Sequence, residues 1–162
     1  MIKNVLGSLL LLCAVFFTVS ASAQDQAAKD EQILKEYFAK NKIKATRTAS
    51  GLYYVVKKKG TGPNAKANQQ VNMNYLGRFL DGKKFDGNVD ENFAPVPGRT
   101  LLTFTLGVHQ VIAGWDEGIQ LLNKGERAVL YIPSALAYGP GGRPSIPPNS
   151  ILMFDVELVS MN

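Results

Sequence analysis

The chain has 162 residues, of which 46% are hydrophobic and 19% are charged. This length and composition predict a single domain with a packed core and exclude wholesale disorder. The formal net charge is +5, but the lysines are scattered, and the one run of them, Lys57 to Lys59, is interpreted as a solvated strand end. A nucleic-acid site is not indicated, because such a site needs a wider basic stripe with interleaved aromatic residues.

The first 23 residues have the layout of a secretory signal peptide. A positive charge at Lys3 precedes an apolar run from Val5 to Val19, and the small residues 21–23 follow. Cleavage is expected after Ala23. The apolar run is short for a membrane-spanning helix, which argues against a retained anchor. We therefore expect an exported, periplasmic protein that is not inserted in the membrane once the signal has been removed.

Cys13 raises an alternative, because a lipoprotein signal ends at a cysteine. Leu12 stands before it, where a small residue is expected, and cleavage there would leave the apolar stretch 14–19 on the mature protein. Cleavage after Ala23 is therefore favoured over a lipoprotein anchored through Cys13. The mature chain then has no cysteine, and its stability must come from packing rather than from disulfides.

Residues 24–50 are expected to form an N-terminal helix and a connector. From Asp25 to about Lys42 the apolar residues recur at helical spacing, with charged residues on the remaining arc. The simpler interpretation is a helix that docks on its own domain, and the alternative is a contact stripe for another subunit or a client protein. A polar connector, Ala45 to Ser50, ends at the break Ser50-Gly51.

Residues 51–162 are predicted to form one α+β domain. Two-residue alternation indicates half-buried strands, Asp81-Gly82 marks a hairpin, and Gly60 to Asn64 is read as a loop. A helical pattern covers Val111 to Leu122, although its two glycines weaken it as an isolated helix. The expected architecture is an antiparallel sheet wrapped around this short helix. The predicted strands are Leu52–Lys57, Val71–Gly77, Leu102–Leu106, Ala128–Ile132 and Leu152–Leu158.

Most catalytic chemistries lack their residues in this sequence. His109 is the only histidine, and it is interpreted as a surface or loop residue. A His or Cys metal site, a Ser-His or Cys-His nucleophile and a phosphate-binding loop are therefore not expected. What remains is a set of aromatic residues that form either ordinary core or, with a few polar groups beside them, a ligand pocket. These are Tyr75, Phe85, Phe104, Trp115, Tyr138 and Phe154.

A series of motifs between Gly51 and Val159 resembles the FKBP-type prolyl isomerase family. Each motif alone has low specificity, but together, in family order and at compatible spacing, they are highly specific. They are Val71-x-x-x-Tyr75-x-Gly77, Asp81-Gly82-Lys83-Lys84-Phe85-Asp86, Phe104-x-Leu106-Gly107, Val111-Ile112-x-Gly114-Trp115-x-x-Gly118, Ala137-Tyr138-Gly139, Ile146-Pro147-Pro148-Asn149 and Leu152-x-Phe154-Asp155-Val156-Glu157-Leu158.

The resemblance implies a twisted antiparallel half-barrel around one short helix, with a proline-binding pocket whose floor is Trp115. The Tyr138 hydroxyl and the Ile112 N–H are expected to donate to carbonyls of the bound peptide, and Asp86 is the expected polar member at the rim. Tyr75 joins these four residues as a catalytic residue. The expected substrate-binding residues are Phe85, Leu102, Phe104, Val111, Ile146 and Phe154.

The resemblance also implies a function, which is peptidyl-prolyl cis-trans isomerisation of unfolded or nascent exported polypeptides, with no cofactor or metal. Macrolides of the rapamycin type are the expected inhibitors. The alternative is a chaperone or binding module with weak or no catalysis. Longer N-terminal helices in exported relatives make dimers, and this helix is short, so we expect a monomer or a weak homodimer.

Three departures from the family pattern lie around the expected pocket. The segment 87–103 is several residues longer than in compact members, Leu102 stands where an aromatic residue is common, and Arg143 stands where histidine is common. The arginine partner of Asp86 is left open between Arg99 and Arg78.

Overall fold

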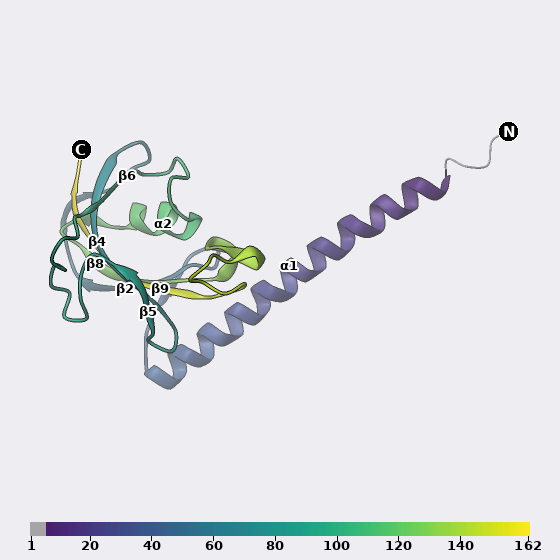
Figure 1. Ribbon diagram of the computed structural model, residues 1–162, viewed down its shortest axis with the longest axis horizontal. Coiled ribbons are helices and arrows are strands. Elements are labelled where there is room, and N and C mark those ends of the chain that lie inside the picture. Colours follow the sequence, from purple (N-terminus) through teal and green to yellow (C-terminus); the bar gives the residue numbers. More distant parts are fainter. Residues whose placement is uncertain (1–5) are drawn as a thin grey trace.

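The computed structural model describes residues 6–162, with side chains described from residue 23 on. A long helix leads into a twisted antiparallel sheet, and a short helix lies within the curve of that sheet (Figure 1). The predicted α+β architecture is therefore confirmed. The helices and 3₁₀ turns are α1 (Leu6–Asn41), α2 (Ala113–Gly118), η1 (Ile119–Leu121), η2 (Ser134–Leu136) and η3 (Gly139–Gly141). The strands are β1 (Thr46–Arg47), β2 (Tyr53–Lys58), β3 (Thr61–Asn64), β4 (Gln70–Phe79), β5 (Lys84–Gly87), β6 (Leu102–Thr105), β7 (Asn123–Lys124), β8 (Arg127–Ile132) and β9 (Leu152–Met161).

The main sheet has the strand order β1-β2-β8-β9-β4-β5, and β6 also pairs with β4. The long strand β4 pairs with β9 along its length, with β6 through residues 70–73 and with β5 through residues 76–78. Along the edge of β4 opposite β9, the partner strand thus changes from β6 to β5 where the sheet curls. Within residues 6–162, β1 pairs with neither β5 nor β6, so the half-barrel stays open.

The central strand β8 buries side chains on both of its faces, and β9 buries them on one. Because side chains alternate along a strand, Leu130 and Phe154 belong to the core that surrounds α2, whereas Val129 and Tyr131 belong to a second cluster on the opposite face. We call these two faces the concave face, which holds α2, and the convex face, which holds α1.

Helix α1 covers the convex face with its C-terminal part. Leu34 is fully buried and Phe38 is 8% exposed, and both pack with Tyr53, Val129 and Tyr131. Burying each such side chain contributes roughly 1.5–3 kcal/mol. The apolar spacing of residues 33–38 therefore serves docking on the helix's own domain, which is the simpler of the two interpretations of that pattern.

Helix α2 is shorter than the pattern from Val111 to Leu122 predicts. It begins after Ile112, whose backbone is extended, and gives way to η1 at residue 119. Its two glycines allow it to approach β8 closely: a Cβ on Gly118 would lie 2.7 Å from Leu130, and one on Gly114 would overlap Ile132. The short helix is thus stabilised by contact with the sheet rather than by its own propensity.

Two segments predicted to be irregular contain strands. Gly60 to Asn64 was expected to be a loop, but Thr61–Asn64 forms β3, which pairs with the distant β7 in a separate two-stranded sheet. The connector 45–50 contains β1, which pairs with β2. Both strands are very short and polar, so alternation within the segment gives no signal.

The predicted signal peptide overlaps the start of α1. Residues 1–5 lie outside the described residues, and α1 runs from Leu6 through Ala23, after which cleavage is predicted. The N-terminal end of α1 projects away from the sheet (Figure 1). Among the residues that the structure describes, no helix is both long and apolar enough to cross a membrane.

Candidate active site

A pocket of about 300 Å³ opens beside α2 on the concave face. Its walls come from β4, β5, β6 and β9, from the start of α2 and from the loop between β8 and β9. The lining residues are Tyr75, Phe85, Asp86, Leu102, Gln110, Val111, Ile112, Trp115, Tyr138, Arg143, Ser145, Ile146 and Phe154.

Trp115 provides the floor of the pocket and is 3% exposed. Tyr75 and Phe154 meet it edge-to-face, with ring centroids 5.4 and 5.2 Å away and interplanar angles of 82° and 86°. Such pairs contribute roughly 0.5–1.5 kcal/mol beyond their buried area. The indole Nε1 is buried and has no hydrogen-bond acceptor among the described residues. The floor is therefore a rigid, mainly apolar surface.

Asp116, the residue after Trp115, orients the segment that leads into α2. It is 6% exposed, and its carboxylate accepts hydrogen bonds from the N–H groups of Gly107 (2.8 Å) and His109 (2.9 Å). These bonds connect the turn after β6 to the start of α2 and so place residues 110–112 at the pocket. The His109 side chain is 88% exposed, as expected of a surface histidine.

The rim on the β4–β5 side is polar. The Tyr75 hydroxyl donates to Asp86 Oδ2 at 2.9 Å, and burial together with this bond raises the pKa of Tyr75 to about 12. Arg99 Nη1 lies 4.0 Å from Asp86 Oδ1, whereas Arg78 Nε is buried without a partner among the described residues. Of the two arginines left open as partners of Asp86, Arg99 is thus the one that lies near it.

Asn88 attaches the long segment 87–103 to β4. It is 5% exposed, its Oδ1 accepts from the Tyr75 N–H at 2.8 Å, and its Nδ2 donates to the carbonyls of Met73 and Thr100 at 3.0 Å. The segment therefore returns to the sheet at both of its ends. This arrangement also brings Arg99 close to the pocket rim.

The opposite rim is formed by the loop between β8 and β9. Arg143 Nη1 donates to the Tyr138 hydroxyl oxygen at 2.8 Å, and its guanidinium lies 5.0 Å from the centroid of the Tyr138 ring. The hydrogen bond to Tyr138 raises the pKa of Arg143. Because the Tyr138 oxygen accepts from Arg143, the hydroxyl proton is left to donate to a ligand.

A second donor lies at the start of α2. Ile112 has an extended backbone, and its carbonyl accepts from the N–H groups of Trp115 and Asp116. Within residues 6–162 no backbone acceptor takes the N–H of Ile112 itself. Two donors, the Tyr138 hydroxyl and the Ile112 N–H, thus belong to residues that line the pocket.

The structure brings together all the predicted site residues except Phe104. That ring is 6% exposed and packs against Trp115 with centroids 5.9 Å apart, so it supports the floor and does not line the pocket. On β6 it pairs with the fully buried Val71.

Sequence reasoning missed several polar residues of the site. Gln110 and Ser145 line the pocket, and Asn88 and Asp116 position segments that do. A lone polar residue in a loop or a short helix carries no periodic signal. The groups that Asn88 and Asp116 bind lie close in space for reasons that local sequence does not express.

Comparisons with known proteins point to one family. Residues 62–159 match the family of FKBP-type peptidyl-prolyl cis-trans isomerases. The chain is 41% identical over 143 residues to the FKBP-type peptidyl-prolyl cis-trans isomerase FkpA of Aeromonas hydrophila, covering 87% of this chain and 50% of that protein. It is 44% identical over 142 residues to a probable FkpA of Neisseria meningitidis serogroup B, covering 87% and 48%. It therefore spans about half the length of these curated relatives.

Solved structures lead to the same family. The crystal structure of FkpA from Escherichia coli matches with a TM-score of 0.68 and 35% identity, covering 100% of this chain and 74% of that one. The crystal structure of AtFKBP13 matches with a TM-score of 0.65 and 34% identity, covering 74% of this chain and 99% of that one. The chain belongs to the FKBP-type peptidyl-prolyl cis-trans isomerase family.

Proposed function

We propose that this protein is a peptidyl-prolyl cis-trans isomerase that binds proline over Trp115. The observation that carries the proposal is an aromatic pocket lined by two residues with hydrogen-bond donors to offer, Tyr138 and Ile112. Its volume of about 300 Å³ leaves room for a proline ring. The relatives named above are described as isomerases of this type, which supports the same conclusion.

The chemistry of the reaction fits such a pocket. Rotation about a peptide bond has a barrier of roughly 18–20 kcal/mol, because the C–N bond has partial double-bond character. No covalent bond breaks, so neither a nucleophile nor a metal is required. An apolar floor disfavours the planar, charge-separated form of the amide, and donors placed for the twisted form stabilise the transition state more than the ground state.

Isomerisation of a short Leu-Pro or Phe-Pro peptide tests the proposal. Removing the Tyr138 hydroxyl in Tyr138→Phe is expected to lower kcat/KM by about 2- to 10-fold, the worth of one hydrogen bond. A double variant that also carries Trp115→Phe is expected to lose more. Tyr131→Phe, which removes a hydroxyl from the convex face, is the matched control. Equal rates for the wild type and the double variant would contradict the proposal.

Binding to the pocket can be followed without catalysis. Trp115 is the only tryptophan of the chain. A macrolide of the rapamycin type is therefore expected to quench or shift the fluorescence of the protein if it occupies the pocket. An unchanged spectrum at saturating ligand would count against the proposed macrolide binding.

We further propose that the protein is exported and acts on unfolded or nascent polypeptides in the periplasm. The support is the layout of residues 1–23, in which a lysine, an apolar run and small residues follow in order. Mass spectrometry of the protein after expression in a bacterium with an export pathway is expected to find Gln24 at the N-terminus. A lipid-modified Cys13 would instead support the lipoprotein alternative.

A second candidate function is client binding without catalysis, and one surface favours it. Ile33 on α1 is 45% exposed, and with Phe79, Leu80, Pro147 and Ile151 it lines a groove of about 440 Å³ outside the proline pocket. Ile33→Glu is expected to reduce suppression of client aggregation while leaving isomerisation unchanged. Equal aggregation suppression by the variant and the wild type would remove this groove as a client site.

The same helix bears on the oligomeric state. Because Leu34 and Phe38 are buried against their own domain, little of the apolar stripe of α1 remains for a partner subunit. We propose a monomer or a weak homodimer. Light scattering over a range of concentrations tests this, and a dimer that persists on dilution would contradict it.

A further inference from the structure

One carboxylate of α1 is buried against the loop that carries Tyr138. Asp30 is 1% exposed, and its Oδ2 accepts from both the backbone N–H (2.7 Å) and the hydroxyl (2.6 Å) of Ser134. Its Oδ1 accepts from Gln26 on the same helix at 2.8 Å. Both oxygens of this buried carboxylate are therefore satisfied, as a buried charge requires.

Ser134 begins the turn that leads to the pocket. It is the first residue of η2, and its carbonyl accepts from the Ala137 N–H at 3.0 Å, directly before Tyr138. Beyond that turn, the Tyr138 hydroxyl accepts from Arg143, which belongs to the same loop. Leu136, Ala137 and Tyr138 also pack against the core, and Asp30 adds a hydrogen-bonded contact from outside the loop to the start of η2.

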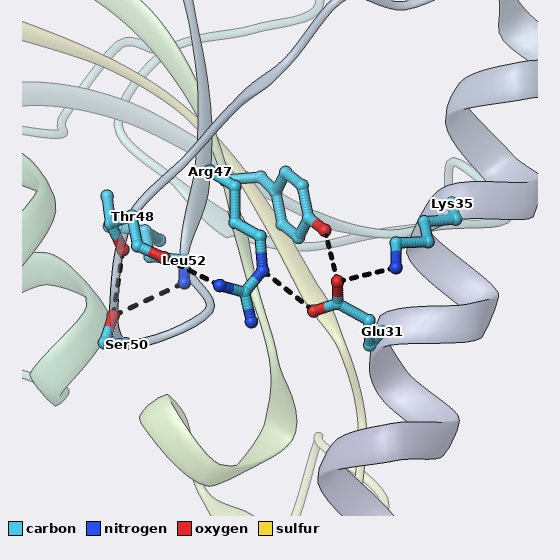
Figure 2. Close-up of polar contacts among 7 residues, drawn as sticks. Glu31, Lys35, Arg47, Thr48, Ser50 and Leu52 are labelled. Atoms are coloured by element: carbon cyan, nitrogen blue, oxygen red, sulfur yellow. Dashed lines mark hydrogen bonds and ion pairs between the residues drawn. The ribbon is translucent and has the colours of Figure 1, made fainter.

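The next residue of α1, Glu31, binds residues of β1 and β2 (Figure 2). Glu31 accepts from the Tyr53 hydroxyl (2.9 Å), from Arg47 (3.0 Å) and from Lys35 (3.0 Å). Burial alone would raise the pKa of Glu31, but the hydrogen bonds from Lys35, Tyr53 and Arg47 lower it below its ordinary value.

From Arg47 the contacts continue to α2. Arg47 Nη1 donates to the carbonyl of Thr48, whose hydroxyl lies 3.0 Å from that of Ser50 (Figure 2). Ser50 in turn donates to Glu117 at 2.6 Å, two residues after Trp115. These side chains are exposed, so this connection is expected to contribute less than the buried one.

We propose that Asp30 is a positioning residue for the isomerase site, since its buried carboxylate fixes the turn Ser134–Leu136 and thereby the Tyr138 hydroxyl across the pocket from Trp115. The proposal rests on the proposed function. It assigns to α1 a role in catalysis that does not require α1 to touch the substrate. Removing the carboxylate leaves two buried donors of Ser134 without an acceptor, which favours a displaced turn.

Asp30→Ala and Asp30→Asn, made in the full-length chain, separate geometry from general damage. Asparagine keeps an oxygen that can accept from Ser134, whereas alanine does not. Glu36→Gln is the matched control, because Glu36 lies on the same helix but is exposed and accepts a hydrogen bond from Gln32 one turn away. Ser134→Ala is the second test variant and removes one of the two donors.

The first readout is amide hydrogen exchange over residues 134–142, which does not depend on activity. We expect Asp30→Ala to raise the exchange rates there by about tenfold, and Asp30→Asn and Glu36→Gln to change them by less than about twofold. Residues 102–106, on the far side of the pocket, serve as the internal reference. Unchanged exchange over 134–142 in Asp30→Ala would overturn the proposal. If Asp30→Ala folds poorly, exchange is measured in Ser134→Ala instead, and unchanged exchange there would overturn the proposal.

The second readout is kcat/KM for a Leu-Pro peptide. Asp30→Ala is expected to lower it by about tenfold and Asp30→Asn to restore most of that loss. In a Tyr138→Phe background the further loss is expected to be under about twofold, because the two residues act through one group. An equal loss in both backgrounds would overturn the positioning role. A wild type without isomerase activity would instead overturn the proposed function, and the exchange rates would still decide whether Asp30 fixes the loop.

Discussion

The two faces of the sheet carry aromatic clusters of similar composition, but one is covered by a helix and the other lines a pocket. On the convex face the ring centroid of Phe38 lies 5.0 Å from that of Tyr53 and 4.9 Å from that of Tyr131. Helix α1, which carries Phe38, covers the two tyrosine rings. On the concave face Tyr75 and Phe154 surround Trp115 at similar distances, yet a pocket opens above them. Aromatic composition alone therefore does not create a site.

The polar groups differ in the same way. On the convex face the Tyr53 hydroxyl donates to Glu31 of the covering helix, so its hydrogen-bonding capacity serves docking. On the concave face the Tyr138 hydroxyl accepts from Arg143 and keeps its proton for a ligand. A face becomes a binding site where no element of the chain covers it and where donors at its rim are left to donate.

The largest expected effect comes from breaking the closed face. Phe38→Ala removes a ring that packs against Tyr53 and Tyr131, and we expect it to lower the free energy of unfolding by about 3–5 kcal/mol. Denaturant unfolding measures this. Ile33→Ala, at a position of the same helix that is 45% exposed, is the control and should change it by less than about 0.5 kcal/mol. A loss below about 1 kcal/mol for Phe38→Ala would show that the helix is not docked as described.

A smaller effect is expected from crowding the concave face. Gly114→Ala places a methyl group where Ile132 already lies, and overpacking of this kind costs about 1–3 kcal/mol. Thermal unfolding compared with Gly141→Ala provides the contrast, because a Cβ on Gly141 meets no atom within 4 Å. Equal stability of the two variants would mean that α2 does not approach β8 as closely as the structure indicates.

Each face has a tyrosine whose pKa is raised to about 12. Burial raises the pKa of Tyr131 to about 12, and burial with the hydrogen bond to Asp86 raises that of Tyr75 to about 12. Since tyrosine ionises near 10 in an unfolded chain, the stability that these groups contribute is complete below about pH 10 and is lost as the pH rises towards about 12. Ultraviolet absorbance of tyrosinate follows the titration. Tyr75→Phe and Tyr131→Phe should each remove one late-titrating group, and a wild type in which every tyrosine has ionised by pH 11 would contradict the assignment.

The smallest effect is expected at the rim. Arg99 is 59% exposed and lies 4.0 Å from Asp86, so Arg99→Gln should lower the free energy of unfolding by less than about 0.5 kcal/mol. Chemical denaturation with and without added salt measures it. A loss well above 1 kcal/mol would mean that this arginine stabilises the long segment 87–103 much more than an exposed pair does.

Where the signal is local, the sequence predicted well. Alternation identified β4, β6, β8 and β9, and the apolar spacing of residues 33–38 identified the docked part of α1. Where the signal is not local, prediction failed: β3 forms because β7 lies next to it. The polar anchors Asp30, Asn88 and Asp116 bind groups that no sequence pattern brings together.

The sequence by itself determined the family and the strands β4, β6, β8 and β9, and it indicated the aromatic residues around Trp115, because periodicity and motif order are properties of short stretches of chain. Tertiary structure alone decided which aromatic cluster stays open and which carboxylate supports the pocket. Asp30 and Ser134 are 104 positions apart, and their contact exists only because α1 lies across the convex face. Hydrogen bonds between such distant residues follow from the packing of whole elements, and that packing is what the sequence pattern does not express.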